Sequence, residues 1–306
     1  MASTPKYKEK NLADWREKFL KSFEGPQPEK LILTPSELTS DRHGSVLCYP
    51  GTDVSSFDSR LLQLKKLGVT ELILEGSSKV GKFGIIGKGC VSIVVKARMD
   101  TEKDVVALKI RRADANRIDT SRDHELQSFA NSFGVGPKAI SHSKDLFAME
   151  YIDSMRLGSW FSTLKTRTPK KYTRSLIQDI LKQCYLLDVH GLDHGELSNP
   201  TKHILLRRNS GGKTLPSTVI IDYESASRDR RVSNLTAVSS FFFLGRGQSQ
   251  KLRKIVGLEG DYSREELVQL LRHYKEAPSI DRFENILLAL LRRKADKASM
   301  VGKQRI

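Results

Sequence analysis

The sequence has little cysteine and no long hydrophobic run. Its 306 residues include three cysteines, which lie far apart and form no Cys-x-x-Cys pair, so neither a disulfide framework nor a zinc site is predicted. No apolar run approaches the about 18 residues that are needed to cross a bilayer. The first residues, MASTPKYKEKNLADW, have no signal-peptide core. These absences predict a soluble intracellular protein, either cytoplasmic or nuclear, with no membrane partner.

Acidic residues are fewer than basic ones. The chain has 52 Lys and Arg against 36 Asp and Glu, a formal net charge of +16. Such an excess attracts phosphate-bearing partners such as ATP, RNA or ribosomes. However, the basic residues stand in separate short groups, and no zinc-finger, RRM or KH signature accompanies them. The charge is therefore compatible with contact to nucleic acid or to a ribonucleoprotein, and it specifies neither.

Hydrophobic residues make up 38% of the whole sequence, enough for one two-lobed domain or two small ones.

The N-terminal part of the chain is polar. Residues 1–50 are predicted to form a partly flexible arm, with an amphipathic helix at Leu12–Phe23 that either docks on the fold or binds a partner. A second helix is predicted over Ser56–Leu67, with Gly68 as its stop signal, and a strand over Glu71–Leu74.

A glycine-rich turn joins two β-branched runs at residues 84–97. Gly87 and Gly89 leave the backbone uncovered, so that amide N–H groups can approach the phosphates of a nucleotide. Ser92 stands where a third glycine occurs in the kinase loop pattern. Two-glycine turns are also common in ordinary hairpins, so this turn alone does not distinguish phosphate binding from a hairpin.

A strand over Val105–Ile110 carries a single lysine, Lys109, among apolar residues. A buried ammonium group needs an acidic partner, because an unpaired buried charge costs several kcal/mol. The helix predicted around residues 124–130 offers Glu125. We therefore predict an ion pair between Lys109 and Glu125.

Two short apolar runs, Ile204–Leu206 and Val219–Ile221, are separated by the polar stretch Asn209–Gly212 and predict a β-hairpin. Acidic residues lie at both ends of it, with Glu196 before the first strand and Asp222 after the second. A loop acid that orients a hydroxyl group, followed by a strand-end aspartate that holds magnesium, is the layout of a kinase catalytic loop and metal-binding segment. Acidic residues at strand ends are also often merely solvated.

The rest of the C-terminal part is predicted to be helical. Apolar residues recur at helical spacing over Thr173–His190, Tyr262–Tyr274 and Ile280–Arg293. Residues 294–306 are predicted to form a frayed basic tail.

In their order along the chain, these segments resemble atypical protein kinases. The stretches that carry the resemblance are IIGKGCVSIVVKA, ALKIRRADANR, NSFGVGPK, MEYI, LDVHGLDHGELS with PTKH, and IDYESAS. They look most similar to the predicted serine/threonine kinases of archaea with fungal relatives, which are distantly related to RIO-type kinases. The resemblance implies an α+β, protein-kinase-like fold of two lobes. Residues 51–152 would form a small N-lobe with a five-stranded antiparallel sheet, and residues 153–293 a mainly helical C-lobe.

The resemblance also implies roles for individual residues. Lys109 would position the α and β phosphates of ATP, and Glu125 would hold that lysine. Asp222 would ligate Mg²⁺. Backbone groups of Glu150 and Ile152 would bind adenine, at the end of an edge strand that leads into the hinge. The other nucleotide-side positions would be Gly87, Gly89, Val94, Ala107 and Met149.

The catalytic loop departs from the family pattern. Glu196 stands where an aspartate base is expected, and its extra methylene moves the carboxylate. No asparagine follows five residues later. His203 takes the position before the strand, where it lies beside the metal or caps the strand, and Asn199 is a second candidate for the missing amide. Glu224 replaces the glycine of the metal-binding segment and is a further candidate ligand.

The resemblance and these residues together predict an ATP- and Mg²⁺-dependent serine/threonine protein kinase that acts on a protein partner. The candidate catalytic residues are Glu196, Lys109 and Asp222, and the candidate metal ligands are Asp222, His203 and Glu224. The main alternative is an ATP-binding pseudokinase or ATPase-type switch in a protein or ribonucleoprotein complex. A small-molecule phosphotransferase and a basic RNA- or ribosome-binding adaptor remain open as well.

Overall fold

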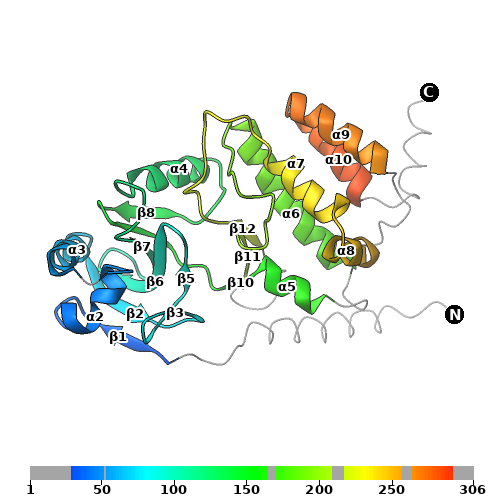
Figure 1. The fold of residues 1–306 in the computed structure, drawn as a ribbon. Helices are drawn as coiled ribbons and strands as arrows, with labels where there is room; N and C mark the ends of the chain where they lie inside the picture. The colour runs from blue at the N-terminus through cyan, green and yellow to red at the C-terminus, as the bar shows by residue number, and fades with distance from the viewer. Residues whose placement is uncertain (1–28, 52, 165–169, 209–216, 257–263, 292–306) are drawn as a thin grey trace, which may run out of the picture. The chain divides into compact units, whose positions relative to one another are not determined.

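The structure is a computed structural model with mixed α and β content (Figure 1). It describes residues 29–51, 53–164, 170–208, 217–256 and 264–291. These form two compact units that divide between Ile152 and Asp153. The predicted helix at Leu12–Phe23, the stretch Asn209–Gly212 and the basic tail lie outside the described residues.

The first unit is built on a seven-stranded antiparallel sheet. Its strands follow the order β1-β2-β6-β7-β9-β8, and β5 pairs with β6. The bounds are Leu31–Leu33 for β1, Val69–Leu74 for β2, Gly87–Lys88 for β5, Ser92–Met99 for β6, Val106–Arg111 for β7, Ala139–His142 for β8 and Leu146–Glu150 for β9. A separate hairpin joins β3 (Ser78–Val80) to β4 (Phe83–Ile85). The sheet exceeds the expected five strands because β1 extends it beyond β2 and the short β5 lies beside β6.

The strand that precedes Asp153 is not at the edge of this sheet. We expected an edge strand over residues 146–152, whereas β9 lies between β7 and β8. The edge is formed by β8, against which helix α4 (Ser121–Asn131) packs. The prediction missed β8 because its four residues include two polar ones, too short a run for a clear alternation.

Strand alternation gives the sheet two different faces, because successive side chains point to opposite sides. One face belongs to the main core of this unit, with helices α2 (Ser40–Leu47) and α3 (Val54–Lys66) beside it in Figure 1. Its residues on the central strands are Ile93, Val95, Ala97, Leu108, Ile110 and Ala148. The opposite face carries a smaller apolar cluster of Ala107, Phe147 and Met149, with Val94 and Tyr151 packed against it.

The fold begins earlier than the sequence predicted. Residues 1–50 were expected to form an arm, but β1 pairs with β2, and α2 buries Val46 and Leu47 completely. The predicted boundary at residue 50 is therefore too late. The helix α2 was missed because its large apolar residues are confined to its last turn, so they show no helical period.

Helix α3 matches the prediction closely. The carboxylate of Asp53 accepts a hydrogen bond from the Ser56 backbone N–H at 2.8 Å and caps the start of the helix. Gly68 follows the helix with φ +73°, a backbone conformation that favours glycine and ends the helix. The helix is tied to the sheet by Arg60, which is buried and forms an ion pair with Asp145 at 3.2 Å.

The second unit is mainly helical. Its helices are α5 (Leu157–Thr163), α6 (Lys170–Val189), α7 (Asn234–Ser239), the π-helical turn η1 (Ser240–Leu244), α8 (Gln248–Val256), α9 (Arg264–Glu276) and α10 (Ile280–Leu291). The strands β10 (Ser154–Arg156), β11 (Ile204–Arg207) and β12 (Thr218–Ile220) form a three-stranded antiparallel sheet. Among the described residues, no helix has the length and apolar character required to span a bilayer.

Two predictions that position the site are confirmed in this unit. The strands β11 and β12 pair antiparallel, with Ile204 opposite Ile220, as expected for the predicted hairpin. The long helix α6 buries Leu176, Ile180 and Leu187 and ends shortly before the loop that carries Glu196. The chain therefore passes from a core helix directly into the loop acid and then into the hairpin.

Candidate active site

The predicted nucleotide-side residues of the first unit share one face of its sheet. Val94 is the register partner of Lys109, and Ala107 is the partner of Met149. Directly opposed residues of antiparallel strands project to the same side. This is the face opposite the main core, and Gly87 reaches it through its pairing with Val94. The structure thus places all five residues on adjacent strands. Glu150 ends β9, and the buried Ile152 follows it.

The glycine-rich turn is tight. The Gly89 N–H donates to the Ser92 carbonyl at 2.8 Å, and Arg112 Nη1 donates to the Gly89 carbonyl at 3.0 Å. A Cβ atom added to Gly87 would lie 3.4 Å from the side chain of Val94, and one added to Gly89 would lie 3.3 Å from the Ser92 carbonyl. Close packing thus favours a small residue at Gly89, in addition to any role in binding phosphate, whereas Gly87 is in ordinary van der Waals contact with Val94.

Lys109 forms its ion pair with Asp123, whereas we predicted Glu125. Lys109 Nζ lies 3.1 Å from Asp123 Oδ2, and the two side chains are only 8% and 13% exposed. Glu125 lies on α4 but is exposed. Asp123 falls on the buried stripe of that helix at three-, four- and seven-residue spacing from Leu126, Gln127 and Ala130. A residue two positions further along points about 200° away around the helix, so Glu125 cannot share this face.

In the second unit, a buried polar network holds the loop that carries Glu196. The Asp188 carboxylate, on α6, accepts from the backbone N–H and the side-chain amide of Asn234, at 3.0 and 2.8 Å. Asn234, at the start of α7, accepts from the His194 N–H at 2.8 Å and donates to the Leu192 carbonyl at 2.7 Å. Two helices therefore fix the backbone immediately before Glu196.

The titration of Asp188 should make stability depend on pH. Burial raises the pKa of Asp188 to about 6, against hydrogen bonds from Leu235, Asn234 and Tyr274 that lower it. The unfolded chain binds this proton with a pKa near 4. The folded state therefore binds it more tightly, and the stabilisation present below pH 4 is lost as pH rises through about 6.

We expect this loss to amount to about 3 kcal/mol, at about 1.4 kcal/mol for each pKa unit. Because Asp188→Asn cannot titrate, the unfolding free energy of the wild type relative to this variant should fall by that amount between pH 4 and pH 7.5. Chemical denaturation at the two pH values measures the difference. A difference that does not change with pH would contradict the assignment.

One end of the β11–β12 hairpin brings together Glu196, His203 and Asp222. One potential ligand atom of each lies within 4.8 Å of the others. His203 Nε2 lies 2.8 Å from Glu196 Oε2, and His203 Nδ1 lies 3.9 Å from Asp222 Oδ2. The other oxygen of Glu196 accepts from Ser225 Oγ at 2.7 Å. The sequence prediction that these acids and this histidine lie at one place agrees with this geometry.

The backbone at Asp222 has an uncommon conformation. With φ +74°, it is the one non-glycine residue with positive φ in the described part of the chain. Aspartate tolerates this region better than most residues, yet it still costs about 1–3 kcal/mol, and such residues concentrate at functional sites. Gly195, with φ +87°, permits a second close approach, since a Cβ atom there would lie 2.8 Å from the Ser225 carbonyl.

The cluster fits a divalent cation. Carboxylate oxygens and a neutral imidazole nitrogen are both common metal ligands. The His203 side chain is 13% exposed, and its Nδ1 atom is buried without a hydrogen-bond partner among the described residues. Asp222 and His203 are therefore the residues that would hold a metal ion.

The sequence offered two further candidate residues near this cluster. Glu224, which we predicted as a ligand, contributes no atom to it. The chain changes direction at Asp222, and Tyr223 is then buried, so Glu224 leaves the cluster. Asn199 is exposed and accepts a hydrogen bond from Thr201 Oγ1 at 2.7 Å, and its role as the missing amide stays a prediction.

Sequence reasoning missed His194, a buried residue whose ring contacts the ring of His203. Its ring lies 5.5 Å from that of His203, and its Nε2 atom is 2.9 Å from the Ile221 carbonyl. Burial lowers the pKa of His194 to about 4, so the ring is neutral at neutral pH. Its position two residues before Glu196 was the available signal.

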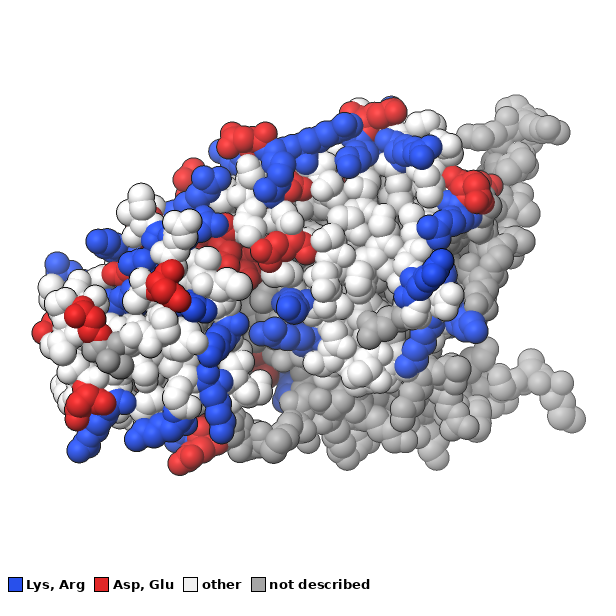
Figure 2. Space-filling view, in the orientation of Figure 1, with Lys and Arg blue, Asp and Glu red and all other residues white. Residues whose placement is uncertain are grey.

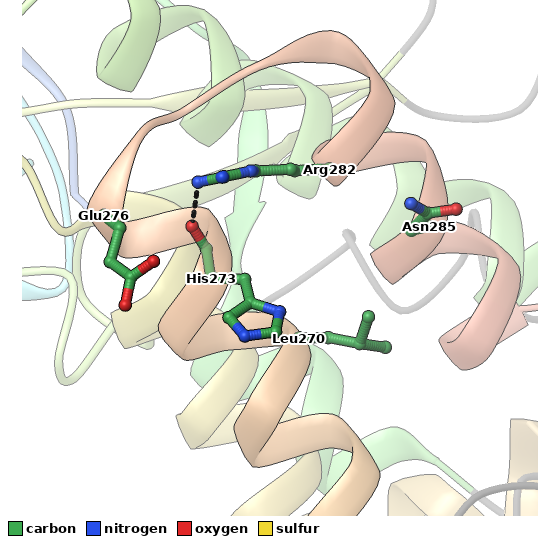
Figure 3. A pocket seen from close by; sticks show the side chains of 5 residues that line it. All are labelled: Leu270, His273, Glu276, Arg282 and Asn285. Carbon is green, nitrogen blue, oxygen red and sulfur yellow. Dashed lines mark hydrogen bonds between the residues drawn. The ribbon is translucent and has the colours of Figure 1, made fainter.

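The hollow shown in Figure 3 lies away from the cluster, between α9 and α10. It has a volume of about 410 Å³ and is lined by Leu270, His273, Glu276, Arg282 and Asn285. Arg282 Nη1 donates to the backbone carbonyls of His273 and Ala277, near the end of α9. The arginine thus stabilises a helix C-terminus, and its role here is structural.

The sequence was also compared with other proteins. Neither the models of known protein families nor the curated proteins give a match to this chain. Its function is therefore inferred from its own residues.

Proposed function

We propose that this protein is an ATP- and Mg²⁺-dependent phosphotransferase, an atypical serine/threonine protein kinase that resembles the archaeal-type family with fungal relatives. In this proposal the two compact units are the two lobes of a kinase-like fold. The observation that carries the proposal is the position of Asp222. Its backbone has positive φ two residues after the end of β12, and its carboxylate lies in one cluster with Glu196 and His203.

The first unit supports the same proposal. A lysine on an inner strand, almost fully buried, forms an ion pair with Asp123. Val94, Ala107 and Met149 form an apolar surface on the same face, suited to an adenine ring. A cationic group beside an apolar patch is the combination that a nucleoside triphosphate requires.

The proposed chemistry depends on positioning and charge. Phosphoryl transfer needs little covalent chemistry from the protein, and most of the catalysis comes from groups that neutralise phosphate charge and align the reacting oxygens. Lys109 would bind phosphate oxygens, and Asp222 would hold the cation. Glu196 would orient the hydroxyl group of the protein substrate. A bound Mg²⁺ ion would supply charge neutralisation at the phosphates.

Label transfer from γ-labelled ATP tests the proposal. With Mg²⁺ present, the purified protein should label itself or a protein substrate, and Glu196→Gln should lower the rate by about 10–100-fold, because a misplaced or neutral acid weakens substrate orientation. Glu265→Gln, an exposed position on α9, is the matched control and should retain the wild-type rate. If the wild-type protein neither transfers label nor releases phosphate, the proposal that it is an enzyme is refuted.

A second candidate is an ATP-binding switch without transferase activity. Both carboxylate oxygens of Glu196 are engaged, one with Ser225 and one with His203, so the group in the base position is already occupied. ATP that raises the thermal stability of the protein without any label transfer would favour this candidate.

The basic surface does not select a nucleic-acid partner. Lys and Arg side chains recur in small groups over the face shown in Figure 2, with Asp and Glu side chains among them. Arg230 is paired with Asp193 at 2.6 Å, and Arg231 donates to the Lys275 carbonyl at 2.7 Å. We therefore propose a protein as the substrate and leave ribonucleoprotein contact as a secondary role of the charge.

A further inference from the structure

The two ring nitrogens of His203 have different surroundings. Nε2 lies 2.8 Å from Glu196 Oε2. An ionised carboxylate only accepts hydrogen bonds, so Nε2 carries a proton and donates it to Glu196. In a neutral imidazole the other nitrogen then carries the lone pair. The hydrogen bond to Glu196 thus leaves Nδ1 of His203 as an acceptor or a metal ligand.

The Nδ1 atom faces Asp222 at a distance that is too long for a hydrogen bond. It lies 3.9 Å from Asp222 Oδ2 and is buried with no hydrogen-bond partner among the described residues. Two acceptors that face each other in a half-buried place repel unless a positive charge lies between them. Metal–nitrogen and metal–oxygen bonds of about 2.1 Å each span such a gap. The separation therefore suits one cation bound to both atoms.

We propose that His203 Nδ1 and Asp222 bind a divalent transition-metal ion, and that this site prefers Mn²⁺ to Mg²⁺. The inference rests on the proposed function, because the ion would be the one that serves phosphate transfer. Mg²⁺ prefers oxygen ligands, whereas imidazole nitrogen is a good ligand for transition metals. Glu196 then orients the imidazole, as carboxylates do behind many metal-binding histidines.

Mn²⁺ is the probe for this site, used with the full-length protein and without nucleotide. Loss of the free-ion signal in electron paramagnetic resonance gives the affinity, and pulsed measurements detect coupling of the bound ion to an imidazole nitrogen. We expect nitrogen coupling in the wild type. His203→Asn should abolish it and weaken Mn²⁺ binding at least about tenfold. Mg²⁺ binding, measured by competition, should change by less than about threefold, because asparagine offers an oxygen ligand.

The matched control is His273→Asn, an exposed histidine on α9. It should keep the coupling and both affinities. Bound Mn²⁺ without nitrogen coupling, or a preference for Mn²⁺ over Mg²⁺ that is the same in the wild type and His203→Asn, would overturn the inference. Either result would indicate that the His203 ring is not a ligand of the ion. The wild-type coupling needs no variant, so misfolding of His203→Asn does not impair the test.

Label transfer from γ-labelled ATP, measured in parallel, separates this inference from the proposed function. Nitrogen-coupled Mn²⁺ together with no transfer in either metal would support the metal site and refute the kinase. Mg²⁺-supported transfer without nitrogen coupling would support the kinase and refute the metal site.

Discussion

Replacing Asp222 by asparagine is expected to lower ATP-dependent phosphate transfer by at least about a thousandfold without unfolding the protein. A preorganised charge at the reacting phosphate contributes an effect of this order. Asparagine keeps the size of the side chain and, like aspartate, tolerates the φ of +74° found at this position. The substitution therefore removes the negative charge that would hold the cation and leaves the backbone turn in place. Label transfer from γ-labelled ATP measures the loss.

The control for this prediction is Asp229→Asn, an exposed aspartate further along the same loop. It should retain the wild-type rate, and both variants should unfold within a few degrees of the wild type. If Asp222→Asn kept more than about a tenth of the activity, an effect far below that expected for a metal-holding carboxylate, Asp222 would not be the residue that holds the metal ion.

Asp123→Ala is expected to lower the free energy of unfolding by about 3 kcal/mol, because it removes a carboxylate that lies 3.1 Å from the buried ammonium group of Lys109. Glu125→Ala, on the same helix but exposed, should change that free energy by less than about 0.5 kcal/mol. Denaturation monitored by circular dichroism compares the two. The pair is a matched control, since the same number of charges is removed from neighbouring positions of α4.

A double substitution separates the loss of the charge pair from a loss of packing. Lys109→Met combined with Asp123→Ala removes both charges, and it should recover at least about half of the stability lost in Asp123→Ala alone. ATP binding should be lost in this double variant whatever its stability. Equal destabilisation by Asp123→Ala and Glu125→Ala would contradict the assigned ion pair.

Elements with a clear period were predictable from the sequence. The helix α6 has apolar residues at helical spacing over five turns, and the strands β11 and β12 are short apolar runs on either side of a polar stretch. The helix α2 and the strands β1 and β8 show no clear period. Pairing with β2 defines β1, pairing with the neighbouring β9 defines β8, and packing against α3 supports α2. Tertiary contacts, rather than local sequence, decide these elements.

The site was predicted where chain geometry alone brings residues together. Glu196 and Asp222 lie at the two ends of one hairpin, so recognising the hairpin places them near each other. The partner of Lys109 was predicted incorrectly because acidic residues occur two positions apart on α4, and the choice depends on which helix face is buried. The apolar residues Leu126 and Ala130, four positions apart, indicated in the sequence which face of α4 is buried.

The buried groups that support the site left no comparable signal. Asp188 and Asn234 lie 46 residues apart in sequence, and each resembles an ordinary surface residue when read alone. Their pairing follows from the packing of α6 against α7, and no spacing rule predicts it.

The hydrogen bonds between Asp188 and Asn234 affect where the loop that carries Glu196 can vary in sequence. One end of the loop is fixed at His194 by Asn234, and the other is fixed where the His203 carbonyl accepts from the Ile221 N–H at 2.9 Å. Residues 195–202 connect these two anchored points and are also packed into the unit, since Leu197 is 2% exposed and the Thr201 carbonyl accepts from the Gly158 N–H at 3.2 Å. Exchanges at the exposed Ser198, Asn199 and Lys202 should therefore change the surface beside the cluster at little cost to folding, whereas an exchange at Leu197 should destabilise the loop.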